Sequence, residues 1–331
     1  MTNQKHQIWV KTFVEKQKQL PPAFDVEKFP FENEGYRNLI NQFLSFSQTN
    51  LKRSCGTVGK KAFVYIVDRN DVNGLAGRVE GIPVVGIFKG SLISLFNLIV
   101  KDTANFKKED YLTYQITILF LYYHEKAHLI QRNTGELWQL DELTSNNGYD
   151  QQQHLREFDA DLYAVTMILP HIEELAARER FPIHELIALA IAGLYILCMD
   201  FMHGNDLFYL KDKSHPHGQL RVLYILTKFI MNITVSEIID LQEHNIGILW
   251  QDKLYKLLDR NESEFNKVIS VFQNHQADME NYIMELQTLQ SNFDNSATLK
   301  DPKLSEKSRN RSRWAATAID FINEKFCSSY K

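Results

Sequence analysis

The feature that most constrains the fold of this chain is an H-E-x-x-H pattern inside a long apolar stretch, residues 111–131. Apolar side chains recur at helical spacing before the pattern, and Gly135 just after the stretch is a plausible stop, so one long helix is predicted. Because a helix turns by about 100° per residue, His124 and His128 lie about 40° apart on one face of it. Two imidazole nitrogens placed in this way can reach one zinc ion.

Two charged residues lie between these histidines. Glu125 cannot easily be a third ligand from its position, but it can take a proton from a water that the metal activates. Lys126 is unusual, because the position after this glutamate is normally uncharged. On the helical wheel Lys126 points about 160° away from the bisector of the two histidines. We expect its side chain to extend toward solvent or to find an acidic partner.

A second helix is predicted over residues 154–169, stopped by Pro170. Glu157 and Asp161 share one face of this helix, whereas Asp159 points roughly the opposite way. We therefore predict Glu157 as the third metal ligand. Asp161 is placed to accept the other ring N–H of a ligating histidine, which would fix the tautomer of that ring. The alternative is an ordinary helix with a solvated acidic face.

Strands and a helix are predicted ahead of the H-E-x-x-H helix. Residues 62–67 and 79–88 are rich in β-forming side chains, and the turn-rich segment 68–77 separates them. Residues 91–100 are predicted as a helix, and residues 139–153 as a polar surface loop. Strands that lead into a helix carrying H-E-x-x-H are the order expected of a zinc-peptidase core.

Charge and cysteine content exclude several classes of function. The net charge of −4 gives no electrostatic footprint for nucleic acid. The basic cluster near the end is interpreted as a solvated segment; it consists of Lys307, Arg309, Arg311 and Arg313. Cys55, Cys198 and Cys327 form no C-x-x-C pair, which favours a reducing compartment and excludes a cysteine-ligated zinc.

No targeting or membrane segment is expected. The first twenty residues are polar and contain lysines, unlike a signal peptide, so a cytoplasmic location is predicted. The apolar stretch 82–100 is interrupted by a proline, glycines and a lysine. The stretch 186–199 is shorter than the roughly 20 residues that span a bilayer. Both are predicted to be buried core elements, and no membrane span is expected.

The remaining segments show mainly helical patterns. Residues 1–60 look helical and polar. Helices are predicted at residues 223–233, 236–241, 249–258, 265–289 and 314–326, and residues 291–313 are polar. Histidines outside the proposed site are interpreted as surface or capping residues: His154, His171, His184, His203, His217, His244 and His275.

The two helices together resemble those of the gluzincin metallopeptidases. The H-E-x-x-H helix is followed by an E-x-x-A-D helix, 157–161. The segment 73–76 and the strand through residue 85 resemble the edge-strand segment of HtpX-like and prenyl-protein endopeptidases. Ser214-His215-Pro216 with Arg221 resembles their S/T-H-P…R element. The resemblance covers about residues 70–225, and the lack of membrane spans makes the layout most similar to the Lit-type phage-exclusion peptidases.

The resemblance implies an α+β, mostly helical fold. We expect a zincin-like core with a small sheet, an H-E-x-x-H active-site helix and additional C-terminal helices. The expected parts are an N-terminal helical segment (1–60), a zincin-like metallopeptidase core (61–230), a C-terminal helical subdomain (231–290), and a polar linker with a terminal helix (291–331).

The resemblance also implies a zinc-dependent endopeptidase in which Glu125 is the general base. Donors to the oxyanion would be His215 and Asn73. Each of these also fits an ordinary turn, His215 before a proline and Asn73 before Gly74. A protein or peptide substrate would lie extended along the edge strand 79–88, making main-chain hydrogen bonds.

Two departures from the family pattern leave alternatives open. One is Lys126. The other is the long segment between His128 and Glu157, which leaves room for Glu142 or Asp150 as a different ligand. The Lit-type resemblance implies a regulated, host-directed protease of phage exclusion. The rival interpretation is a zincin-fold regulatory or binding module without turnover, but a module of that kind need not retain Glu125. The sequence specifies no oligomeric state.

Overall fold

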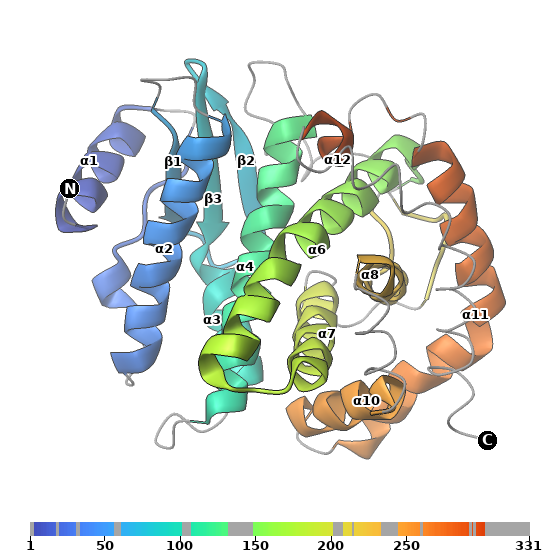
Figure 1. The fold of residues 1–331 in the computed structure, drawn as a ribbon. Coiled ribbons are helices and arrows are strands. Elements are labelled where there is room, and N and C mark those ends of the chain that lie inside the picture. The colour runs from blue at the N-terminus through green and yellow to red at the C-terminus, as the bar shows by residue number, and fades with distance from the viewer. Residues whose placement is uncertain are drawn as a thin grey trace. The chain divides into compact units, whose positions relative to one another are not determined.

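The chain folds into two compact units, Met1–Ser145 and Asn146–Lys331. The computed structural model describes residues 3–17, 20–30, 34–55, 61–100, 107–131, 148–200, 208–213, 215–232, 244–258, 261–290, 293 and 296–301. The predicted α+β, mostly helical class with a small sheet is confirmed (Figure 1). The division into four parts stays a prediction.

The first unit contains a three-stranded sheet together with several helices. Its elements are α1 (Asn3–Lys16), the 3-10 turn η1 (Val26–Lys28), α2 (Glu34–Cys55), β1 (Phe63–Val67), β2 (Gly74–Val79), β3 (Ile82–Phe88), α3 (Lys89–Ile99) and α4 (Lys108–Gln131). The helices predicted at 91–100 and 111–131 are confirmed as α3 and α4. Helix α4 carries the whole H-E-x-x-H pattern. Gly135, its expected stop, lies outside the described residues.

The strand order corrects the predicted edge strand. The order is β1-β3-β2, with β3 parallel to β1 and antiparallel to β2. Among the described strands β3 is therefore central, and the prediction that residues 79–88 form an edge strand is wrong. Residues 74–77, predicted as part of a turn, belong to the edge strand β2.

The hairpin turn between β2 and β3 falls inside the stretch 79–88, which was predicted to be one strand. Val79 pairs with Ile82, so only Glu80 and Gly81 connect β2 to β3 (Figure 1). Both have positive φ angles, 51° and 74°. Two-residue hairpin turns of this kind match the twist of the strands and favour glycine. Asn73-Gly74 looked like a turn only because the same residue types are common in turns.

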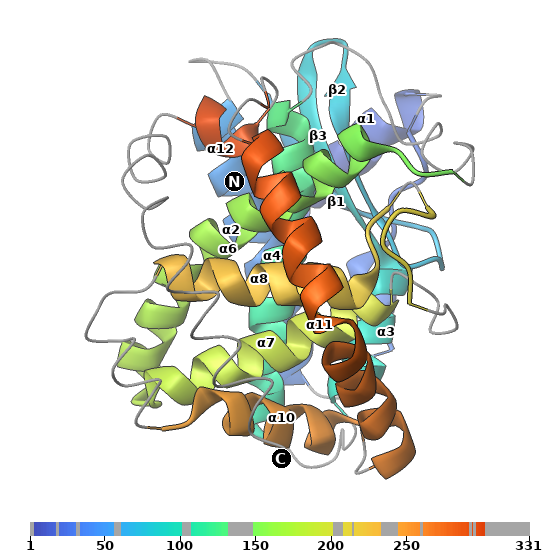
Figure 2. The same ribbon diagram turned by 90° about the vertical axis from the view of Figure 1, so that its right-hand side faces the viewer.

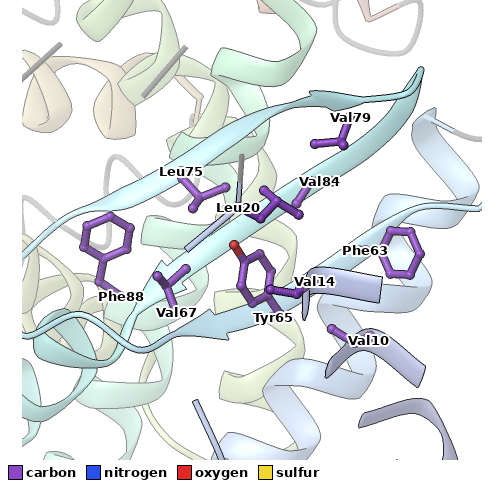
Figure 3. Packing of buried hydrophobic residues seen from close by; sticks show 10 residues of the cluster. All are labelled: Val10, Val14, Leu20, Phe63, Tyr65, Val67, Leu75, Val79, Val84 and Phe88. Atoms are coloured by element: carbon purple, nitrogen blue, oxygen red, sulfur yellow. The ribbon is translucent and has the colours of Figure 1, made fainter. Parts of the chain in front are cut away.

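One face of the sheet is covered by the N-terminal helix. Alternate residues of β1, namely Phe63, Tyr65 and Val67, point to this face, as the period of two along a strand requires (Figure 3). Val10 and Val14 of α1 pack against them. The sheet also packs against α2 at β1 and against α4 at β2 and β3. Helix α4 is thereby placed next to the edge strand.

The second unit is helical. Its elements are α6 (Gln151–Glu179), α7 (Ile183–Asp200), α8 (Gly218–Asn232), α10 (Ile246–Leu257), α11 (Glu262–Gln290) and α12 (Ala297–Lys300). Helix α6 packs against α7, α8, α11 and α12, and α11 runs from the α10 end across α8 toward α12 (Figure 2). The helices predicted at 223–233, 249–258 and 265–289 are confirmed as α8, α10 and α11. The segments predicted at 236–241 and 314–326, and the basic cluster, lie outside the described residues.

Helix α6 is longer than predicted at both ends. It begins at Gln151 because the Asp150 side chain caps it, accepting from the backbone N–H groups of Gln152 and Gln153 in the first turn. It continues past Pro170 to Glu179 and ends where Arg180 adopts a left-handed conformation. The predicted stop at Pro170 and the predicted loop over 151–153 are therefore wrong. A proline removes one N–H but does not force a long, well-packed helix to end.

Both apolar stretches form core elements, as predicted. Residues 82–100 form β3 and α3, and residues 186–199 belong to α7, whose described side chains on that stretch are almost all buried. In the part of the chain that the structure describes, no helix combines the length and the apolar character needed to cross a membrane.

Candidate metal centre

The two histidines of the pattern face each other on α4. His124 and His128 are buried, and their Nε2 atoms lie 3.0 Å apart. Two nitrogens bound to one tetrahedral zinc at about 2.0–2.1 Å are roughly 3.3 Å from each other. The pair therefore fits a single metal ion. The predicted convergence of the two rings is confirmed.

His128 has an outer partner that the sequence did not reveal. Its Nδ1 lies 3.0 Å from Oε1 of Gln131, which can only accept. With Nδ1 as the donor in this contact, the lone pair of Nε2 is left for a metal ion, as a ligand atom requires. Gln131 belongs to no sequence motif. Only its position three residues after His128 on one helix indicated that the two side chains could meet.

The carboxylate of Glu125 lies against the start of the edge strand. Glu125 is buried, and its side chain fills the space beside Gly74, the first residue of β2. The preceding Asn73 accepts from the Gly74 N–H through Oδ1, at 2.8 Å. This is the local turn contact considered above, and it leaves the Nδ2 amide of Asn73 as a donor. The oxyanion role of Asn73 stays a prediction.

Lys126 does not reach solvent, so that part of the prediction is wrong. Its side chain packs behind α4 at 1% exposure, and Nζ donates to Oδ1 of Asn50 on α2 at 2.7 Å. The ammonium also lies 5.5 Å from the ring centroid of Tyr123. An amide oxygen and an aromatic face supply the polar surroundings that a buried ammonium needs. Lys126 thus links the H-E-x-x-H helix to α2.

The acidic residues of α6 are buried in the second unit. The solvated-face alternative is therefore wrong, because Glu157, Asp159 and Asp161 all have buried side chains. Arg221 of α8 donates to both oxygens of Asp161 at 2.9 and 2.7 Å, and its Nη1 lies 3.7 Å from Oε2 of Glu157. This confirms that the two carboxylates share a face, and Arg221 links α8 to both of them.

The charge state of this cluster follows from its pairing. Burial alone would lower the pKa of Arg221, but the facing Asp161 and Glu157 carboxylates hold that pKa well above its usual range. The guanidinium stays charged and compensates the two buried carboxylates. Both oxygens of Asp161 are engaged by Arg221, so the predicted role of Asp161 toward a histidine ring stays a prediction.

Glu157 has a second partner on its own helix. Nε2 of Gln153 donates to Oε1 of Glu157 at 3.0 Å, and it also lies 3.4 Å from Nε2 of His215. His215 approaches Glu157 Oε1 to 4.0 Å, and its side chain is 42% exposed. The S-H-P segment therefore meets α6 beside the predicted ligand. The oxyanion role of His215 stays a prediction, and Ser214 lies outside the described residues.

Asp159 points away from this cluster, as predicted. Its Oδ1 accepts from Ser296 Oγ at 2.6 Å and its Oδ2 accepts from the Ala297 N–H at 2.6 Å. Asp159 therefore fastens the segment around α12 to the opposite side of α6.

One histidine outside the site was interpreted wrongly. His154 is buried rather than on the surface, and its ring bridges the Lys213 carbonyl at 2.9 Å and the Tyr282 hydroxyl at 2.8 Å. Burial lowers its pKa. His217 is a capping residue as predicted, accepting from the Gln219 N–H at the start of α8 at 3.2 Å. His203 lies outside the described residues.

The assignment of the three metal ligands stays a prediction. His124, His128 and Glu157 make up a set of buried side chains that could hold a metal ion. Of the alternative ligands, Asp150 caps α6 instead, and Glu142 lies outside the described residues.

One family model matches the part of the chain that contains these three residues. The family model Peptidase U49 matches residues 105–237, less than half of the chain. This is the Lit-type peptidase family, and the matched span includes the H-E-x-x-H helix, the acidic helix α6, and His215 with Arg221. No curated protein and no solved structure gives a significant match to the chain.

Proposed function

We propose that the chain is a zinc-dependent endopeptidase whose metal is held by His124, His128 and Glu157. The observation that carries the proposal is the buried histidine pair, with both Nε2 atoms facing each other on a helix inside the Peptidase U49 match. Two imidazoles and one carboxylate are a ligand set that suits zinc and leaves a fourth position open.

When bound, zinc polarises the scissile carbonyl and lowers the pKa of the attacking water. The protein's own groups would do the rest. Glu125 accepts the proton from that water at its carboxylate and passes it to the leaving amine. His215 and Asn73 donate hydrogen bonds to the carbonyl oxygen as negative charge develops on it. Arg221 would orient Glu157 through the contact between its guanidinium and the Oε2 atom of the carboxylate.

The substrate is proposed to be a protein or peptide segment bound as an added strand along β2. This strand is at the edge of the described sheet and begins beside Glu125. Main-chain hydrogen bonds to an edge strand bind extended peptides with little demand on their sequence. The similarity to Lit-type peptidases supports a host-directed role in phage exclusion, in the cytoplasm.

The test combines metal analysis with cleavage. Single alanine variants of His124, His128 and Glu157 should each lose most of the bound zinc, whereas the exposed Glu173→Ala should retain it. Full zinc in Glu157→Ala would contradict the ligand assignment.

Cleavage is followed as new N-termini formed in a cell lysate. Glu125→Gln should retain zinc and lose turnover by several orders of magnitude, because an amide cannot accept the proton. A wild-type protein that binds zinc yet cleaves nothing would instead favour a zincin-fold binding module.

A further inference from the structure

Gly74 is a glycine in a place where the backbone does not require one. It is the buried first residue of β2 and pairs with Ile87 in the regular register of the hairpin. Among the described glycines, only Gly81 has a positive φ angle. Any L-residue could therefore adopt the backbone conformation of Gly74. Its lack of a side chain must be explained by space rather than by conformation.

That space is filled by Glu125. A Cβ atom added to Gly74 would overlap Cδ, Oε1 and Cγ of the glutamate, and these are the three heavy atoms nearest to it. The carboxylate thus occupies the volume that a side chain at position 74 would take. No other group competes as closely for this volume.

The backbone on the other side of this contact is held in place. The hydroxyl of Ser91 accepts from the Asn73 N–H at 2.8 Å and donates to the Asn73 carbonyl at 2.7 Å. The Phe88 N–H donates to the same carbonyl at 3.2 Å. With the Gly74 N–H bound to Oδ1 of Asn73, the start of β2 is tied to α3 and cannot easily retreat.

We propose that Gly74 is a positioning residue that sets the location of the Glu125 carboxylate. The inference rests on the proposed role of Glu125 as general base. A methyl group at position 74 meets the far end of a flexible side chain on one side and a tied backbone on the other. The carboxylate therefore moves and the fold does not. A general base displaced from its water loses its contribution to the rate.

The test is the Gly74→Ala variant. Turnover in the lysate assay should fall by about 10²–10⁴-fold, the usual contribution of a positioned general base. Zinc content should stay unchanged, and the melting temperature should stay the same or rise slightly, because a strand glycine is less favourable than alanine. A purely structural role would lower the melting temperature together with activity.

Gly86→Ala is the matched control, in the neighbouring strand β3. A Cβ there would lie 2.6 Å from Cγ of Leu75 and 2.7 Å from Cγ2 of Val67, both core side chains. This variant should lower the melting temperature while folded protein retains turnover. A second control combines Gly74→Ala with Glu125→Gln, which should give no further loss, because the base that Gly74 positions is already absent.

A crystal structure of Gly74→Ala gives a readout that needs no substrate. We expect the Glu125 carboxylate to leave its position beside β2 while the strand and α4 keep their places. An unmoved carboxylate, or turnover within a few-fold of wild type while Glu125→Gln is inactive, would overturn the inference. An active Glu125→Gln would instead overturn the proposed function.

Discussion

Two glutamine side chains hold the ligand groups of the proposed zinc site. Gln131 accepts from the outer nitrogen of His128, and Gln153 donates to Glu157. Each lies three or four residues from its partner on the same helix, so helix geometry brings the two groups together. Amides of this kind carry no charge and belong to no motif, which is why the motif residues could be predicted and these could not.

Replacing Gln153 should weaken metal binding. In Gln153→Leu the Oε1 atom of Glu157 loses its donor, and partners of this type typically contribute 10–100-fold in metal affinity. Zinc affinity is measured by competition with a chelator. Gln152→Leu is the control, because that side chain is exposed in the same turn. Equal affinities in the two variants would show that Gln153 does not orient Glu157.

The buried Lys228 should make the free energy of unfolding depend on pH in the alkaline range. Burial lowers the pKa of this α8 side chain to about 8, below its ordinary value of 10.5, and its ammonium lies 4.8 Å from the ring centroid of Tyr224. Between these two pH values the unfolded chain binds the proton and the folded chain does not, so stability rises with pH across that window. Below pH 8 the full cost of burying the charge is present.

Lys228→Met should remove this cost. At pH 7 the variant should be more stable than wild type by up to about 3 kcal/mol, the equivalent of the pKa difference. The advantage should shrink as the pH rises from 8 toward 10.5. Urea unfolding at pH 7 and pH 10 measures both quantities. A variant less stable than wild type at pH 7 would mean that the charged form is well compensated.

At the scale of elements, periodic helices were predictable and the sheet was only partly so. Helix α4 was predicted within three residues at its start, because apolar side chains recur at helical spacing ahead of the H-E-x-x-H pattern. Strand β2 was missed because glycines at positions 74 and 77 resemble a turn. One of those glycines accommodates Glu125, a reason that depends on a contact far away in sequence and invisible to local patterns.

Helix α6 continues through Pro170, so replacing this residue measures how much a proline inside the helix costs in stability. Pro170 is exposed, so replacing it should disturb little packing. Pro170→Ala restores a backbone N–H and removes the helix cost of proline. The unfolded chain becomes more flexible at the same time, which offsets part of this gain. The net stabilisation should be about 1–2 kcal/mol. The free energy of unfolding is measured in urea, with the exposed Glu173→Ala as control. A destabilised variant would show that packing against α7 and α8 depends on the proline.

At the scale of the whole molecule, Asp159 connects distant parts of the second unit. The carboxylate binds Ser296 and Ala297, and Gln290 of α11 approaches it to 3.4 Å. The sequence predicted that Asp159 points away from Glu157 but not what it binds. Ser296 lies 137 residues after Asp159 in the chain, so this contact forms only when α11 and α12 pack against α6. No local sequence pattern predicts that packing.

Asp159→Ala should therefore loosen one segment without affecting the metal. It leaves a hydroxyl and an N–H without their acceptor, at a cost of about 1–3 kcal/mol for each buried group. Ser296→Ala removes only the bond from the Ser296 hydroxyl and should cost less. Hydrogen exchange at residues 296–301 should rise more in Asp159→Ala than in Ser296→Ala, with zinc content unchanged in both. Loss of zinc in Asp159→Ala would mean that the two faces of α6 are coupled.

The same long-range contact bears on how the protein is made. Synthesis runs from the N-terminus, so the ribosome produces Asp159 long before Ser296, 137 residues later. Until then its carboxylate has to stay in water, because burying it without these partners would be unfavourable. Helix α6, which carries the proposed ligand Glu157, can therefore finish packing only late in translation.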